Sequence, residues 1–335
     1  MPGRGSAAER VFAYGATAGL LADLLFADPR RGHPVAAFGR SAGAVERVLW
    51  RDHRGWGALH TAVCVAGATG AAALAGRLVR DRRAASVVLT AAATWSVVGG
   101  TSLGREARAV GAALSAGDTE RARTLLPRLC GRDPQALDER QMARAVVESV
   151  AENTSDAVVG ALVWGAVAGV PGLVGFRAVN TLDAMVGHKS AAYRRFGWAS
   201  ARLDDVAGWP GARLTAALAT AFGGDPRGAL RAVRADAARH PSPNAGPVEA
   251  AFAGALGVRL GGTLAYGGRV EHRPVLNGAA GRPVEVADIE RAVRLSRRVT
   301  WLTLGVCAVG RFAVGAGFGA GSRFRSGVVG RRGSI

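Results

Sequence analysis

The feature that most constrains this chain is a set of long segments without charged side chains. Residues 57–76, 84–104 and 157–176 contain no Asp, Glu, Lys or Arg, and each is close to the about 20 residues that a helix needs to cross a bilayer core. All three segments are rich in Ala and Gly, which lets helix backbones approach closely. The sequence therefore predicts an all-α fold, a polytopic integral membrane helical bundle.

Two further segments are weaker candidates for membrane spans. Residues 11–27 are apolar except for Asp23, and residues 299–320 carry only Arg311. The first segment leads into charged residues rather than a small-residue cleavage site, so we expect it to stay attached as a span. The composition agrees with a membrane protein, because 49% of the residues are hydrophobic and the mean hydropathy is +0.15. A soluble all-α protein with Ala-rich core helices is the alternative.

The remaining sequence predicts a large polar face of surface helices and loops. No Ser- or Pro-rich linker separates an independently folding unit, so we expect one integral membrane domain over residues 1–335. Helical periodicity and capping signals predict surface helices. These cover 105–126, 138–156, 224–240 and 288–299, and an Arg-rich tail occupies 323–335.

The chain is strongly basic, with a net charge of +18 from 43 basic and 25 acidic residues. A basic patch can indicate nucleic-acid binding, but aromatic residues make up only 6% of the chain and no zinc-ligand spacing appears. Attraction to anionic lipid headgroups explains the charge more simply, so we expect the lipid bilayer, and no nucleic acid, as a partner. Lys189 is the single lysine, and either a specific role or chance accounts for it.

The segment 157–176 contains a helix-breaking sequence, "GVPG" at 169–172. Proline removes a backbone hydrogen bond, and the part of the segment before the break rises only about 20 Å. Because a bilayer core is about 30 Å thick, a re-entrant hairpin is an alternative to a full crossing. Such a hairpin would bring residues 180–189 beside residues 148–156.

The distribution of arginine leaves the membrane topology open. Residues 28–56 carry six arginines, and residues 77–83 carry four. Cytoplasmic loops are usually the arginine-rich ones, yet these two loops cannot lie on the same side if residues 57–76 span the membrane.

The stretch "ESVAENTSD" at 148–156 places carboxylates at the edge of an apolar segment. In an α-helix Glu148, Glu152 and Asp156 fall on one face within about two turns, where like charges repel. A cation would relieve this repulsion, and Mg²⁺ prefers one or two carboxylates together with phosphate oxygens. A solvated helix face, with Arg144 as an ion-pair partner, is the structural alternative.

Three further polar clusters flank the predicted spans or turns. They are "DPRRGHPV" (28–35), "NTLDAMVGHK" (180–189) with "ASARLDD" (199–205), and "HPSPNAG" (240–246). Helix capping, surface ion pairs and turns are the ordinary roles of such residues. The joint occurrence of four clusters in one membrane protein favours a shared polar site.

The clusters, in this order, resemble the adenosylcobinamide-phosphate synthase family, the CobD/CbiB proteins of cobalamin biosynthesis. The similarity runs from about residue 11 to about residue 320, and "ESVAENTSD", "NTLD" and "SARLDD" are its most specific parts. The departures are small. Ala27 stands where a glycine usually precedes the Asp-Pro pair, His188 replaces a usual aromatic residue, "AGPVEAA" differs before Glu249, and "GWPGARL" shifts a proline by one place.

The resemblance implies a multi-pass enzyme of the cell membrane, a ligase that forms an amide bond. It would join adenosylcobyric acid to (R)-1-amino-2-propanol or its O-phosphate, using ATP and Mg²⁺ and without a tightly bound cofactor. Other corrin-pathway enzymes are candidate partners. A free carboxylate does not condense with an ammonium group in water, so the acid must first be activated, most simply as an acyl phosphate. Acidic ligands for Mg²⁺ and arginines for phosphate oxygens suit that step.

The resemblance also implies roles for the clustered residues. We expect Glu148, Glu152 and Asp183 to be catalytic, as bases toward the amine or as metal ligands, and Glu152, Asp156 and Asp183 to hold Mg²⁺. The expected substrate-binding residues are Asp28, His33, Asn153, Asn180, Lys189, Arg202, Asp204 and Asn244.

Two other functions fit parts of the same sequence. A transporter of a corrinoid or another anionic small molecule would use intramembrane charges such as Asp23 and Arg311 and a helix broken by Pro and Gly. Against it, the two halves of the chain do not match and most polar residues lie outside the spans. A scaffold that docks soluble corrin-pathway enzymes at the membrane is the other alternative.

Overall fold

The structure is a computed structural model that describes residues 4–28, 32–188, 190–266 and 269–326. It is mostly helical, as predicted. The helices are α1 (Arg4–Phe26), α2 (Pro34–Leu49), α3 (Arg54–Val79), α4 (Arg83–Val97), α5 (Gly100–Ser115), α6 (Thr119–Leu125), α7 (Glu139–Asn153), α8 (Gly160–Val186), α9 (Trp198–Phe222), α10 (Pro226–Asp236), α11 (Ala245–Leu256) and α12 (Ala287–Ser326). Short helical turns are η1 (Leu126–Arg128), η2 (Pro134–Ala136), η4 (Ala237–Arg239) and the π-helical η3 (Thr154–Val159).

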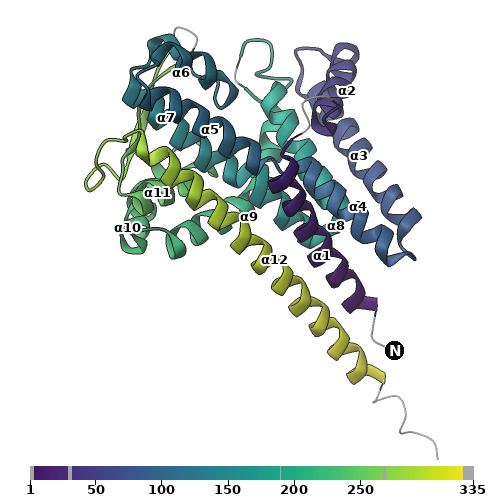
Figure 1. Cartoon of the computed structure of the whole chain (residues 1–335). Helices are drawn as coiled ribbons and strands as arrows, with labels where there is room; N and C mark the ends of the chain where they lie inside the picture. Colours follow the sequence, from purple (N-terminus) through teal and green to yellow (C-terminus); the bar gives the residue numbers. More distant parts are fainter. Residues whose placement is uncertain (1–3, 29–31, 189, 267–268, 327–335) are drawn as a thin grey trace, which may run out of the picture.

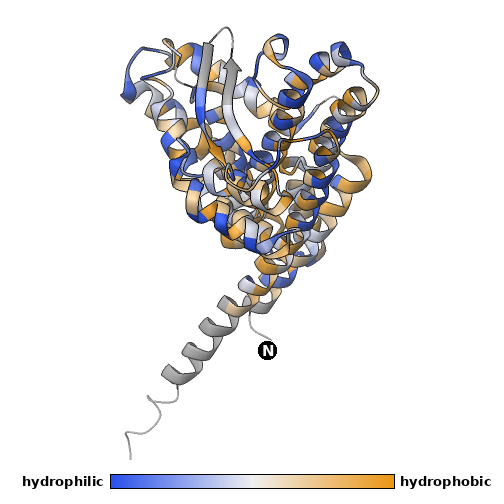
Figure 2. Cartoon of the chain, turned by 90° about the vertical axis from the view of Figure 1, so that its left-hand side faces the viewer, coloured by the Kyte–Doolittle hydropathy of each residue, from blue (hydrophilic) through white to orange (hydrophobic). Residues whose placement is uncertain are grey.

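The long helices lie side by side and the shorter ones gather at one end (Figure 1). Helix α1 packs on α4 and α12, and α8 packs on α3, α4 and α9. The left-hand side of Figure 1, away from α1, α3 and α4, holds α5, α6, α7, α10 and α11. Large apolar side chains such as Leu78 and Val88 are exposed on the long helices, and hydrophobic ribbon reaches the outer face of the bundle in Figure 2. An apolar outer face is what a bilayer requires.

Three helical segments are long and apolar enough to cross a membrane among the residues that the structure describes. They are Arg54–Val79, Arg83–Ser115 and Glu139–Val186, and they contain the three uncharged runs. The run 84–104 is not one straight helix, because Val98 is extended and separates α4 from α5. Consecutive glycines at 99 and 100 explain this break, since glycine disfavours a helix interior.

The two weaker candidate spans both lie in helices. Residues 11–27 coincide with most of α1, and residues 299–320 lie within α12. Helix α12 has 40 residues, because the predicted surface helix 288–299 continues into the candidate span without a break. The end of the Arg-rich tail, from residue 327, lies outside the described residues.

Helix α8 is a hairpin of two helical halves that meet at Gly169. The backbone of Gly169 has φ of 66° and ψ of −144°, a conformation that essentially only glycine adopts. A Cβ on Gly160 would clash with the Phe176 ring, and a Cβ on Gly172 would clash with the carbonyl of Trp164. In a straight helix the second pair would lie about 12 Å apart along the axis. The chain therefore turns back here, with the geometry that the re-entrant alternative requires.

Two of the surface helices begin at capping residues, as predicted for α10. Asp138 and Gln141 form a capping box at the start of α7, and Asp225 caps α10 with Pro226 at its first position. The predicted helix 105–126 is two helices instead, because the chain turns at Gly117, where φ is 72°.

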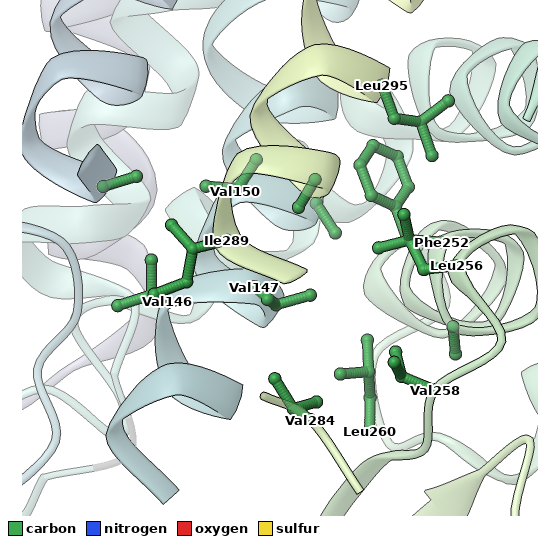
Figure 3. Packing of buried hydrophobic residues seen from close by; sticks show 14 of the residues in the cluster. Val146, Val147, Val150, Phe252, Leu256, Val258, Leu260, Val284, Ile289 and Leu295 are labelled. Carbon is green, nitrogen blue, oxygen red and sulfur yellow. The ribbon is translucent and has the colours of Figure 1, made fainter. Parts of the chain in front are cut away.

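The main hydrophobic core fixes the orientation of α7. Val146, Val147 and Val150 pack against side chains of α11 and α12, among them Phe252 and Ile289 (Figure 3). Because this face of α7 is buried, the face that carries Glu152 is left for the polar site.

A β-hairpin is the one element class that the sequence did not predict. Strands β1 (Leu260–Tyr266) and β2 (Arg269–Leu276) pair antiparallel, with Leu260 opposite Leu276. Both leucines are buried in the main core and anchor the hairpin. The sequence signal was present, since Gly267 and Gly268 separate two short segments rich in β-branched and aromatic residues.

The close packing of the α8 halves predicts the effect of one added methyl group. Gly172→Ala should lower the stability of the protein in detergent by about 1–3 kcal/mol, because the Trp164 carbonyl occupies the space that the new Cβ needs. Gly70→Ala on α3 is the matched control, since a Cβ there meets nothing within 4 Å. Thermal unfolding measures both variants, and equal melting temperatures for the two would contradict the hairpin packing.

Candidate functional site

The acidic residues predicted from three separate stretches, 148–156, 180–189 and 199–205, converge at one end of the bundle. Glu152 comes from α7, Asp156 from η3, Asp183 from the second half of α8, and Asp204 from α9. Their charges interact: Asp183 repels both Glu152 and Asp204, and Asp204 repels Asp156. The turn at Gly169 makes this convergence possible, because it returns the chain to the end from which α8 began.

Glu148, one turn before Glu152 on α7, has protein partners at both of its carboxylate oxygens. Its Oε2 pairs with Arg132, while its Oε1 accepts a hydrogen bond of 2.6 Å from the Gly261 amide and lies 3.8 Å from Arg144 Nε. The side chain is buried. Glu148 therefore connects α7 to the loop that carries Arg132 and to β1, and its catalytic role stays a prediction.

Glu152, one turn further along α7, is placed differently. Its side chain is exposed to solvent, although protein charges surround it on several sides. Arg273 and Arg132 attract its carboxylate, while Glu148 and Asp183 repel it. Glu152 is thus an accessible carboxylate in a mixed field of charges, as a residue that meets a substrate must be.

Asp156 does not continue the helical stripe of Glu148 and Glu152. The chain is π-helical from Thr154 to Val159, and each π turn holds an extra residue, which changes the direction of the side chain. Asp156 is repelled by Glu152 and by Asp204, and it is attracted to Arg177. Asp156 therefore lies among charges from α7, α8 and α9.

Two amide side chains donate hydrogen bonds to α9, one to the Asp204 carboxylate and one to the Asp205 backbone. Asn180 Nδ2 donates to Asp204 Oδ1 over 3.4 Å, and Asn244 Nδ2 donates to the Asp205 backbone carbonyl over 2.9 Å. Burial and the neighbouring Asp183 charge raise the pKa of Asp204 to about 7. Asp204 is therefore poised between its neutral and charged forms near neutral pH.

The predicted wall residues Asp28 and His33 contact each other. His33 Nε2 lies 3.4 Å from Asp28 Oδ1, and His33 Nδ1 accepts a hydrogen bond from the Val35 amide at the start of α2. The Asp28 charge also attracts Arg177. This pair therefore borders the Asp156 side of the site through Arg177.

The remaining predicted residues are less directly involved. Arg202 is exposed and lies 3.5 Å from Asp205 Oδ2, which is the surface ion-pair alternative. The Asn153 amide donates to the Ser149 carbonyl of its own helix over 2.9 Å. Lys189 lies outside the described residues.

Sequence reasoning missed several charged residues of the site. Glu249 on α11 is buried, and burial together with repulsion from Glu148 and Glu152 holds its pKa well above the usual range. It stood as a single charge in the apolar run 245–256, which is the signal that could have found it. The missed cations are Arg132, Arg177 and Arg273.

The described residues do not form a ready-made protein cage for a metal ion. No group of three or more His, Cys, Asp or Glu side chains in this part of the chain is arranged to bind one. The predicted ligands Glu152, Asp156 and Asp183 are close enough to repel one another, which suits Mg²⁺ brought in on phosphate oxygens, because that ion needs only one or two protein carboxylates.

The different surroundings of Glu148 and Glu152 predict opposite effects on stability. Glu148→Gln should destabilise the protein by on the order of 3 kcal/mol, because it removes the charge of the carboxylate that is paired with buried Arg132. Glu152→Gln should leave stability unchanged or slightly raised, since the side chain is exposed and the removed charge is repelled by Glu148 and Asp183 as well as attracted by Arg273 and Arg132. Thermal unfolding in detergent compares the two, and equal losses would contradict the separation of roles.

The raised pKa of Asp204 predicts a pH dependence of stability. Between about pH 4 and pH 7 the folded protein keeps a proton on Asp204 that the unfolded chain has released, so stability falls as pH rises through this window. The asparagine side chain cannot ionise. The Asp204→Asn variant should therefore lack the loss of roughly 1–3 kcal/mol in the free energy of unfolding that Asp204 causes over this pH window. Unfolding curves at pH 4, 6 and 8, recorded in EDTA without nucleotide, make the measurement. Parallel pH profiles for the two proteins would refute the raised pKa.

Comparison with known proteins identifies a family. The family model described as CobD/Cbib protein matches residues 16–296. A cobalamin biosynthesis protein CobD of Mycobacterium tuberculosis is 53% identical over 293 residues, which cover 86% of this chain and 92% of that protein. Proteins of the same name from Chromobacterium violaceum and Rhodobacter capsulatus are 42% and 41% identical, over 89% and 84% of this chain and 96% and 90% of their own lengths. No solved structure matches the chain.

Proposed function

The chain belongs to the CobD/CbiB family of cobalamin biosynthesis proteins, and from this premise we propose that it is the ligase that forms the amide bond of adenosylcobinamide or its phosphate. Its substrates would be adenosylcobyric acid, ATP, and (R)-1-amino-2-propanol or its O-phosphate. The observation that carries the proposal is the convergence of Glu152, Asp156, Asp183 and Asp204 beside arginines, one of which, Arg132, is buried.

The mixed charges of the site suit a reaction between anions and a cation. ATP and the corrin carboxylate are both anionic, and Arg132 and Arg273 supply positive charge beside Glu152. The amine enters as an ammonium ion, and the carboxylates Asp183 and Asp204 supply the opposite charge. Arginines on some elements would thus bind the anionic substrates, and carboxylates on neighbouring elements would bind the ammonium ion next to them.

The chemistry divides into two balanced steps. The corrin carboxylate attacks the γ-phosphorus of ATP, which forms an acyl phosphate and releases ADP. The ammonium ion then loses a proton, and the resulting amine attacks the acyl carbon. The amide C–N bond forms as the C–O bond to phosphate breaks, and the second nitrogen proton leaves with the departing phosphate. The released proton needs an acceptor within hydrogen-bond reach, and Glu152 and Asp183 are our candidates.

Mg²⁺ would supply charge neutralisation on the phosphate oxygens when bound. Glu152, Asp156 and Asp183 are the residues that would hold it. The chain's own contribution is to keep these carboxylates together despite their repulsion, through the packing of α7, α8 and α9. Asn180 and Asn244 hold the part of α9 that carries Asp204 and Asp205 by their hydrogen bonds.

We place the protein in the cell membrane as a multi-pass protein. The apolar segments of α3, α4 and α8 support this location. The acidic end would face the cytoplasm, because ATP is supplied there. The turn at Gly169, where the two halves of the α8 hairpin meet, would then reach toward the other membrane surface.

The proposal predicts the behaviour of one conservative variant. Glu152→Gln should abolish amide product, with at least a 100-fold loss, because a charged ligand or base is removed while the fold and membrane insertion are kept. Glu120→Gln, an exposed residue that pairs with Arg123 at 2.6 Å on α6, is the matched control and should keep full activity.

The assay incubates detergent-solubilised protein with cobyric acid, ATP and Mg²⁺, and with each amine separately, and detects products by mass spectrometry. Amide product from the purified protein alone would exclude a role as a scaffold only. Full activity of Glu152→Gln would overturn its assignment. Substrate uptake into vesicles without any turnover would favour a transporter instead.

A further inference from the structure

A large cavity lies at the end of the bundle away from the acidic site. Its volume is about 640 Å³, and it is bordered by α1, the turn between α3 and α4, the turn of α8 and Arg311 of α12. Gly169 lines it, whereas Asp156 and Asp183 lie about 20 Å away along the two arms of the α8 hairpin. The cavity is therefore separate from the proposed catalytic site.

The mouth of this cavity carries an excess of positive charge. Arg80 and Arg83 line it, and the same short segment, "RLVRDRR" at 77–83, contains two more arginines against one acid, Asp81. Asp81 lies 3.6 Å from Arg80, and both side chains are largely exposed. An anion that enters the cavity would thus meet arginines that are free to move toward it.

Arg311 also lines the cavity. Its guanidinium donates to the carbonyls of Gly165 and Ala166, at the end of the first half of α8, and it stacks over the Phe12 ring at 5.5 Å. Arg311 therefore has a structural role as a cap of the helix end. The charge available to a ligand comes mainly from the 77–83 turn.

Exposed apolar side chains surround the same end of the molecule. Leu78 is 76% exposed, Val167 is 69% exposed and Val309 is 69% exposed, and each neighbours a cavity element in sequence. The walls themselves include Ala7, Val11 and Leu89. A basic mouth beside an apolar surface is suited to an amphipathic anion rather than to free phosphate, because only the former covers both.

We propose that this cavity binds one anionic phospholipid, with its phosphate at Arg80 and Arg83 and an acyl chain against the walls from α1 and α4. The bound lipid accounts for the second arginine-rich loop, which lies one crossing of α3 away from the arginines of residues 28–56. The general bias of arginine toward one membrane side leaves that loop unexplained. The proposal rests on the membrane location and not on the reaction.

Native mass spectrometry of the detergent-solubilised protein tests this site. The protein is titrated with phosphatidylglycerol or with phosphatidylcholine of the same acyl chains. We expect one phosphatidylglycerol to bind with preference. The double variant Arg80→Gln/Arg83→Gln should weaken it by about 30-fold, since each arginine near anionic lipid contributes about a fivefold factor. The control Arg121→Gln/Arg227→Gln removes the same charge from exposed positions on α6 and α10 and should bind as the parent does.

Each outcome decides the matter. Equal binding of the two lipids, or an unchanged preference in the double variant, would overturn the proposal. A third arm adds inorganic phosphate, and displacement of the lipid by millimolar phosphate would show a site for free anions instead. Amide-forming activity is measured alongside. Protein that retains no lipid of either kind would count against the membrane location, whereas lost turnover with lipid preference intact would count only against the proposed reaction.

Discussion

The tight packing of the two halves of α8 is the constraint on which the rest of the structure depends. Gly160 and Gly172 leave room for Phe176 and the Trp164 carbonyl, and Gly169 takes the backbone conformation that reverses the chain. With side chains at these positions the halves could not touch. A straight helix of this length would carry Asp183 about 40 Å from Asp156, and no shared acidic site would exist.

The charges at the site fall into two groups with different physical roles. Glu148 is neutralised by Arg132 and held by the Gly261 amide, so it joins elements and has little capacity left for a ligand. Glu152, Asp183 and Asp204 repel one another and are stabilised chiefly by the framework around them. Carboxylates held in mutual repulsion gain most from a bound cation, which is why this second group suits the proposed chemistry.

The two ends of the α8 hairpin therefore face different surroundings. One end holds carboxylates among arginines, and the other meets a cavity with a basic mouth and apolar walls. The same short element thus connects the proposed site of reaction to the proposed lipid site. The apolar helical turns of α8, packed on α3 and α4, separate the carboxylates of the acidic site from the arginines beside the cavity.

The sequence by itself determined the helical class, the three apolar runs and the polar clusters, because these depend on local composition and period. The cap at Asp225 was equally local, and it caps α10 as predicted. The sequence also established the family, since "ESVAENTSD" and "NTLD" are contiguous motifs. The β-hairpin was within reach of the same local reasoning through its paired glycines.

Only the tertiary structure decided which charges meet. Arg132 and Arg273 belong to none of the predicted clusters, and they join the site because distant elements fold onto α7. The π-helix at Asp156 and the structural role of Glu148 likewise depend on partners that spacing cannot reveal. The physical reason is that electrostatic interaction depends on distance through space, and one turn at Gly169 sets that distance for residues far apart in the chain.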